Sequence, residues 1–222
     1  MYLSKLLLNP RCRESRRDVS SPYELHRTLA RAFETEPGTD YRARHGVLFR
    51  LEPLAYGSAL PTVLVQSVSE PNWHELPEAY LLHRPESKPL APAFAAGQTL
   101  AFRLVANPTK KEKRPGQRQG RRVALTDVAE GDELTPACAW LTRKGEQHGF
   151  SVLYATTDAF WLGSGSDQVS NQTAKQRLPL YGVRYDGLLQ VTNPEFMEQA
   201  IRVGIGSAKA FGFGLLSLAR PR

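Results

Sequence analysis

Hydrophobic and polar residues follow two spacings along the chain, one typical of strands and one typical of helices. Apolar runs of strand length predict strands at residues 2–8, 47–54, 62–67, 99–106, 150–154 and 215–218. Helical spacing and start signals predict helices at residues 22–33, 73–80, 136–149 and 194–203. A weak strand is expected near residues 81–82, and residues 180–191 form either one strand or a hairpin that turns at Asp186-Gly187. The polar segments 11–21 and 155–176 are expected to be loops.

The elements come twice in the order strand, helix, strand, strand, helix, strand. This order predicts an α+β protein made of two tandem ferredoxin-like (RRM-like, βαββαβ) domains. Three prolines between residues 84 and 92 indicate a short linker. We therefore expect an N-terminal domain at residues 1–88 and a C-terminal domain at residues 95–222. The duplication is one of pattern only, because the two halves share no strong sequence repeat.

The first predicted helix carries three start signals in succession. Ser21 can cap the helix, Pro22 suits its first position, and Glu24 completes a capping box. On a helical wheel the apolar residues face one side and should contact a sheet; they are Leu25, Leu29, Ala32 and Phe33. The other side carries Tyr23, Arg27, Ala30 and Arg31, and His26 lies at the border between the two sides.

His26 and Tyr23 are the candidate catalytic residues. They are three positions apart on the predicted helix, so their side chains are neighbours. An imidazole titrates near neutral pH and can accept or donate a proton, and a phenol can hydrogen-bond a hydroxyl or a phosphate. Arg27 and Arg31 nearby match phosphate geometry. The alternative is a structural histidine, which is the more common role of a lone histidine on a helix.

Composition and charge narrow the possible functions. The chain of 222 residues carries a net charge of +7. Residues 107–123 contain seven basic residues and one acidic residue, a net +6, so one segment holds most of the excess. The basic residues are Lys110, Lys111, Lys113, Arg114, Arg118, Arg121 and Arg122. Such a segment is either a hairpin that lies in an RNA groove and neutralises phosphates or a solvated loop.

Two distant cysteines, Cys12 and Cys138, predict neither a disulfide framework nor a zinc site. No histidine pair has the spacing of zinc ligands, so no metal site and no cofactor are expected. No apolar run approaches the roughly 18 residues of a membrane span. We therefore expect a reduced, cytoplasmic protein with no membrane partner.

A glycine-rich segment near the C-terminus is the last candidate site. Its backbone can approach phosphates closely, and Lys209 adds a positive charge. The candidate binding residues in it are Gly204, Gly206, Ser207, Lys209, Gly212 and Gly214. The segment follows a helix and does not open one after a strand, which excludes a dinucleotide fingerprint. A plain structural turn is the alternative.

Taken together these motifs resemble one family. The opening residues 1–5, the helix around His26, the strand at residues 102–108 and the glycine-rich segment 204–218 look like the CasE-type CRISPR-associated endoribonucleases, in the family's order. The resemblance implies two ferredoxin-like domains and metal-independent cleavage of a CRISPR repeat hairpin at the base of its stem. It also implies a 2′,3′-cyclic phosphate and a 5′-hydroxyl as ends, and a protein that stays on the crRNA with other Cascade subunits.

The resemblance makes His26 the catalytic histidine and Tyr23 its partner at the 2′-hydroxyl. The basic segment would be the family's groove-binding hairpin. Two other interpretations stay open at this point. One is a non-catalytic RNA-binding subunit of a ribonucleoprotein, and the other is a basic protein of unrelated role in which His26 is structural.

Overall fold

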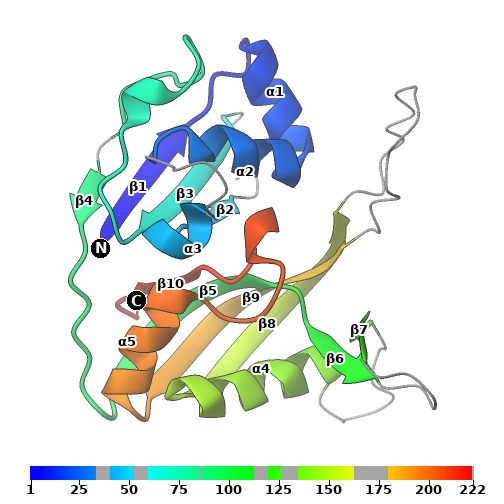
Figure 1. Ribbon diagram of the computed structural model, residues 1–222. Coiled ribbons are helices and arrows are strands. Elements are labelled where there is room, and N and C mark those ends of the chain that lie inside the picture. Colours follow the sequence, from blue (N-terminus) through cyan, green and yellow to red (C-terminus); the bar gives the residue numbers. More distant parts are fainter. Residues whose placement is uncertain are drawn as a thin grey trace.

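The computed structural model describes residues 1–33, 41–52, 60–85, 87–112, 120–126, 135–162 and 180–221. Two four-stranded antiparallel sheets with helices beside them make up an α+β fold (Figure 1). The first half of the chain builds one sheet and the second half builds the other. Among the described residues, no helix is long and apolar enough to cross a membrane.

The N-terminal sheet has the strand order β2-β3-β1-β4. Its strands are β1 (Tyr2–Leu7), β2 (Leu48–Leu51), β3 (Thr62–Ser67) and β4 (Ser87–Pro89). The helices among the described residues of this half are α1 (Arg13–Ser20), α2 (Pro22–Ala30), α3 (Tyr41–His45) and the 3-10 turn η1 (Trp73–Glu75). The apolar residues expected on one side of α2, Leu25 and Leu29 among them, are buried in the core of this half.

Three predictions for the N-terminal half were wrong, and a fourth held only in part. The expected loop at 11–21 contains helix α1, whose buried residues are the polar Ser15 and Asp18. The expected helix at 73–80 is only the short turn η1. The expected linker contains β4, which pairs with β1, while the weak strand is reduced to one bridge between Leu8 and Leu81. Helix α1 buries polar side chains, and β4 is held by pairing with a strand that is distant in the sequence. Neither feature produces a periodic pattern of apolar residues from which it could be predicted.

The C-terminal sheet has the strand order β10-β5-β9-β8. Its strands are β5 (Thr99–Ala106), β8 (Phe150–Leu162), β9 (Leu180–Val191) and β10 (Leu216–Ala219). Helices α4 (Pro136–His148) and α5 (Pro194–Val203) flank it. A separate two-stranded hairpin, β6 (Thr109–Glu112) and β7 (Arg121–Ala124), is inserted between β5 and α4. The expected hairpin in the basic segment is therefore confirmed.

One prediction for the C-terminal half was wrong, and one open alternative is decided by the structure. Residues 155–162, expected in a loop, belong to β8, because their main chain pairs with β9 as far as Leu162. Residues 180–191, expected to form either one strand or a hairpin, are the single strand β9, and Asp186-Gly187 lies inside it. Gly187 faces the register shift between Val152 and Tyr154, where a Cβ would collide with the Tyr154 carbonyl. The glycine therefore permits a β-bulge and does not mark a turn.

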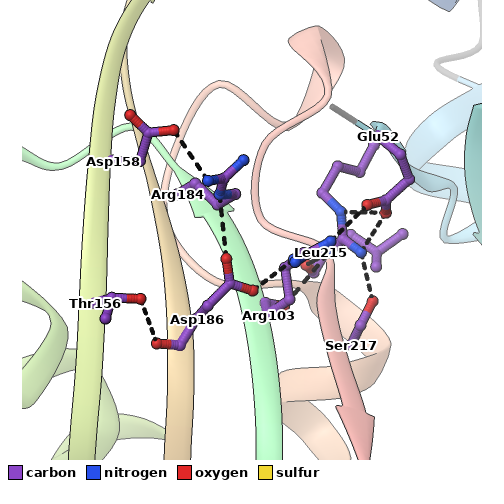
Figure 2. A network of polar contacts seen from close by, with 9 residues as sticks. Glu52, Arg103, Thr156, Asp158, Arg184, Asp186, Leu215 and Ser217 are labelled. Carbon is purple, nitrogen blue, oxygen red and sulfur yellow. Dashed lines mark hydrogen bonds and ion pairs between the residues drawn. The ribbon is translucent and has the colours of Figure 1, made fainter. Parts of the chain in front are cut away.

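Buried polar side chains join the two halves of the molecule. Arg50 of β2 is only 2% exposed and donates hydrogen bonds to the carbonyls of Arg103 and Leu215 and to the Ser217 hydroxyl. Figure 2 shows how this network continues across the C-terminal sheet. Gln66 of β3 forms a second connection, because it donates a hydrogen bond to the carbonyl of Ile201 in α5. The two sheets are thus held in a fixed relation, which matters for a site that draws residues from both.

Candidate active site and basic groove

Helix α2 places Tyr23 and His26 on the N-terminal half. Ser21 accepts a hydrogen bond from the Glu24 main-chain nitrogen, and Pro22 occupies the first turn, as predicted. The expected return bond of the capping box is absent, because the Ser21 nitrogen donates to the Asp18 carbonyl. The Glu24 carboxylate instead lies 3.7 Å from Arg17 and 3.3 Å from Arg27. Helix α1 therefore supports the start of α2 in place of a complete capping box.

The His26 imidazole is held between aromatic rings and a buried hydroxyl. Its ring centroid lies 4.9 Å from that of Tyr41 and 6.2 Å from that of Phe49. The Tyr41 hydroxyl is 2.8 Å from Nδ1 of His26 and also donates to the His26 main-chain carbonyl at 2.8 Å. His26 is half-buried, whereas Tyr23 is 40% exposed. This is an oriented histidine near the surface, which suits proton transfer to a bound molecule better than a core position does.

The two arginines expected beside His26 are both exposed. Arg27 forms an ion pair with Glu24 in the same helix. A small pocket of about 100 Å³ gathers Arg27 and Arg31 with Arg17, Glu24 and Thr28. The arginine charges are therefore partly balanced on the protein, and Arg31 caps the C-terminal end of α2.

The glycine-rich segment runs from α5 through the 3-10 turn η2 (Lys209–Phe211) to β10, and η2 contacts both α2 and β2. Its glycines at 204, 206, 212 and 214 all have positive φ. A Cβ on Gly212 would lie 3.2 Å from the ring of Phe49, the same ring on which His26 stacks. Protein atoms also fill the Cβ positions of Gly204 and Gly214. Most of these glycines therefore serve close packing of the segment against the protein.

A basic groove of about 380 Å³ lies between the β6–β7 hairpin, α4 and the glycine-rich segment. Its basic lining residues are Lys111, Arg122, Lys144, His148 and Lys209. Gly204, Gly206 and Ser207 complete the glycine-rich wall, while Thr109, Trp140 and Val203 line the remainder. No carboxylate belongs to the described lining, so the groove is suited to a polyanion.

The cations of this groove perturb one another. Burial, followed by the charges of Lys144 and Lys209, lowers the pKa of His148. Burial, followed by the charges of Arg42 and Lys144, lowers the pKa of Lys209. Lys209 is thus influenced both by Arg42 on α3 and by Lys144 on α4. Positive charge therefore continues from the groove toward the part of the molecule that carries Tyr41 and His26.

The hairpin places its described basic residues in different environments. Lys111 and Arg122 line the groove and pair in register across β6 and β7. Arg121 is exposed, and Lys110 forms an ion pair with Glu112 at 2.8 Å. Lys113, Arg114 and Arg118, also expected to bind RNA, lie outside the described residues. The hairpin therefore gives the groove its outer wall.

Three residues of this region were not found from the sequence. Tyr41 was not connected to His26, which is 15 positions away. Lys144 and His148 were not among the predicted binding residues, but both line the groove. Their spacing of four on α4 was the available signal, since it places both side chains on one face.

Among the described residues, no group of three or more histidine, cysteine, aspartate or glutamate side chains could hold a metal ion.

Comparisons with known proteins agree on one family. Residues 1–220 match the model of a family described as CRISPR associated protein. The CRISPR-associated endoribonuclease Cse3 of Thermus thermophilus is 40% identical over 99% of this chain and all of the relative. The Cascade subunit CasE of Escherichia coli K12 is 27% identical over 99% of both chains.

A solved structure extends the agreement to three dimensions. Thermus thermophilus Cse3, bound to an RNA representing a pre-cleavage complex, superposes with a TM-score of 0.81 at 36% identity, over 98% of both chains. The match spans both sheets and therefore the interface between them. The chain belongs to the Cse3/CasE family of CRISPR-associated endoribonucleases.

Proposed function

We propose that this protein is a metal-independent endoribonuclease that binds the hairpin of a CRISPR repeat and cuts the pre-crRNA at the base of the stem. The observation that carries the proposal is the position of the glycine-rich segment. It forms one wall of the basic groove, and its turn η2 contacts the helix that bears Tyr23 and His26. An RNA held in the groove would therefore reach the candidate catalytic residues.

The chemistry needs few protein groups because RNA carries its own nucleophile. The 2′-hydroxyl attacks the adjacent phosphorus, the bond to O5′ breaks, and the products end in a 2′,3′-cyclic phosphate and a 5′-hydroxyl. His26 exchanges a proton with the reacting atoms, and Tyr23 hydrogen-bonds the 2′-hydroxyl or the phosphate. The exposure of Tyr23 and the aromatic clamp on His26 support these roles.

The binding surface combines the groove with the arginines of α2. Lys111, Arg122 and Lys209 neutralise phosphates, as expected from the sequence, and Lys144 and His148 join them. Double-stranded RNA is recognised mostly by its shape and backbone, which a cationic groove can follow. Arg121 extends the surface along the outside of the hairpin, and Arg27 and Arg31 extend it beside Tyr23.

The strand orders support the finer assignment of the fold. Each sheet places its fourth strand beside its first and its second beside its third, with all neighbours antiparallel. Two ferredoxin-like domains of this kind, at residues 1–88 and 95–222, would share the site between them.

We further propose that the protein works in the cytoplasm and stays on its crRNA with other Cascade subunits, since a relative is named a Cascade subunit.

The test uses the full chain and a repeat hairpin RNA in EDTA. Wild type and His26→Ala are compared for binding and for cleavage under single-turnover conditions. A second RNA carries one 2′-deoxy substitution at the cut position. The variant is expected to bind normally and to cut roughly 100- to 10,000-fold more slowly, the usual contribution of a proton-transferring group. The deoxy RNA should bind and remain intact.

Other outcomes would favour the alternatives. Tight and selective binding without cleavage by any protein would identify a non-catalytic RNA-binding subunit. Cleavage of the deoxy RNA would exclude attack by the 2′-hydroxyl. A protein with no preference for the hairpin over unstructured RNA would contradict the proposed substrate.

A further inference from the structure

The hydroxyl of Tyr41 has two partners on the same residue. It lies 2.8 Å from Nδ1 of His26 and 2.8 Å from the main-chain carbonyl oxygen of His26. Tyr41 begins α3 and is 7% exposed, so bulk water does not readily replace these partners. The arrangement therefore constrains where the protons on these three atoms can lie.

Counting protons settles the direction of each bond. A phenol has one O–H donor, and a carbonyl oxygen can only accept. If the phenol donates to the carbonyl, Nδ1 must carry a proton that it donates to the phenol oxygen. In the opposite case the phenol donates to Nδ1, and two oxygens then face each other at 2.8 Å with no proton between them. The chain Nδ1–H to hydroxyl to carbonyl satisfies every atom.

Neighbouring rings keep this geometry in place. Tyr41 stacks on Phe33, with ring centroids 6.0 Å apart, and the His26 ring lies between Tyr41 and Phe49. A flip of the imidazole would move Nδ1 away from the hydroxyl and leave the buried phenol with one partner fewer. The packing therefore favours one ring orientation as well as one tautomer.

We propose that Tyr41 is a positioning residue that keeps the proton of the neutral His26 ring on Nδ1, so that Nε2 is the nitrogen that exchanges a proton with the RNA. The neutral ring then enters the reaction as a base. The 2′-hydroxyl proton moves to Nε2, O2′ bonds to phosphorus, and the bond to O5′ breaks with its electron pair on O5′. Water protonates O5′, and the imidazolium returns its proton to water.

This inference rests on the proposed function for its reaction, but not for its tautomer. Nitrogen-15 NMR of the isolated full chain reports which ring nitrogen of His26 carries the proton in the neutral form. The wild-type protein is expected to carry the proton of the neutral ring on Nδ1 and none on Nε2. Tyr41→Phe keeps the ring and removes only the hydroxyl, so it should lose this preference. It should also cut about tenfold to a hundredfold more slowly while binding RNA with unchanged affinity.

Tyr185→Phe is the matched control, because it removes another buried hydroxyl that donates to a carbonyl, at Ala137 in the C-terminal half. It should cut at the wild-type rate. A proton on Nε2 in the wild type would overturn the proposal, and this result does not depend on the folding of any variant. Cleavage by Tyr41→Phe at the rate of the wild type would also overturn it. A protonated Nδ1 in a wild type that leaves RNA uncut would overturn the proposed function and the reacting role of Nε2, while the tautomer would stand.

Discussion

The guanidinium of Arg50 donates a hydrogen bond across the molecule to the main-chain carbonyl of Leu215, 3.1 Å away. Arg50 belongs to the N-terminal sheet, and Leu215 directly precedes β10 of the C-terminal sheet. Glu52 completes the link, because its carboxylate pairs with Arg50 and lies 3.1 Å from Arg103 of β5. Burial lowers the pKa of Arg50, and the Glu52 carboxylate opposes this effect. This buried cation is thus one of the groups that fix the relation between the groove and α2.

Replacement of Arg50 by methionine should destabilise the protein strongly. It removes the hydrogen bonds that Arg50 donates to two carbonyls and to the Ser217 hydroxyl, and a broken buried ion pair costs about 3 kcal/mol or more. Urea unfolding should show this loss. Arg184→Met is the matched control, since Arg184 pairs with Asp158 and Asp186 within the C-terminal sheet and is more exposed. An equal loss in both variants would contradict the special role of the contact between halves.

Local signals explain what could be predicted from the sequence. Ser21, Pro22 and the spacing of Leu25 and Leu29 predict helix α2. Thr135 and Gly149 mark the two ends of α4 in the same way. These signals act within a few residues, so they can be recognised without the tertiary structure. The same holds for β5 and the hairpin, whose turns and alternation lie in one short segment.

Long-range contacts explain what could not be predicted. Helix α1 buries Asp18 under the hydroxyl of Tyr80, which lies 62 positions later. The outer part of β8 is largely exposed, and its main chain pairs with β9 as far as Leu162. The contact of Tyr41 with His26 depends on the placement of α3, and the two residues are 15 positions apart in the sequence. The candidate catalytic helix could therefore be found from sequence, whereas the residue that orients its histidine could not.

Removal of charge from the hairpin should change how RNA binding depends on salt. In the variant Arg121→Gln with Arg122→Gln, two cations no longer displace counterions from phosphates. The slope of log K against log salt should decrease in magnitude by about 1 to 2. Binding measured between low and high salt gives this slope. Lys5→Gln with Lys88→Gln removes two exposed charges from the N-terminal sheet and should leave it unchanged, so equal slopes in all three proteins would exclude the hairpin from the interface.

Alanine at Gly212 should disturb cleavage more than RNA binding. The position has a φ of 86°, and the new Cβ would press on Phe49, the ring beneath His26. Gly97→Ala is the matched control, because Gly97 has a φ of 81° and no atom within 4 Å of its Cβ position. Both variants should lose about 1 kcal/mol or more in thermal or urea unfolding through backbone strain. Only Gly212→Ala should cut slowly in single-turnover assays. Cleavage by this variant at the normal rate would show that the glycine-rich segment does not influence His26.

His148 should make RNA binding tighter at lower pH. Burial and the charges of Lys144 and Lys209 hold its pKa below the ordinary 6.5 in the free protein, so the ring is neutral near pH 7. A phosphate in the groove would favour the imidazolium and raise this pKa. The complex then binds more protons than the free protein does, and affinity increases as the pH falls through 6.5 and below.

Affinity measured from pH 7.5 to 5.5 at constant salt tests this linkage. Each unit by which RNA raises the pKa of His148 contributes up to roughly a tenfold gain in affinity. His148→Gln should lose that gain, while His74→Gln, which changes an exposed histidine of η1, should keep it. Because the other histidines remain in both variants, the difference between them isolates His148. If both variants follow the wild-type curve, no phosphate binds beside α4, and the RNA follows a different path across the basic groove.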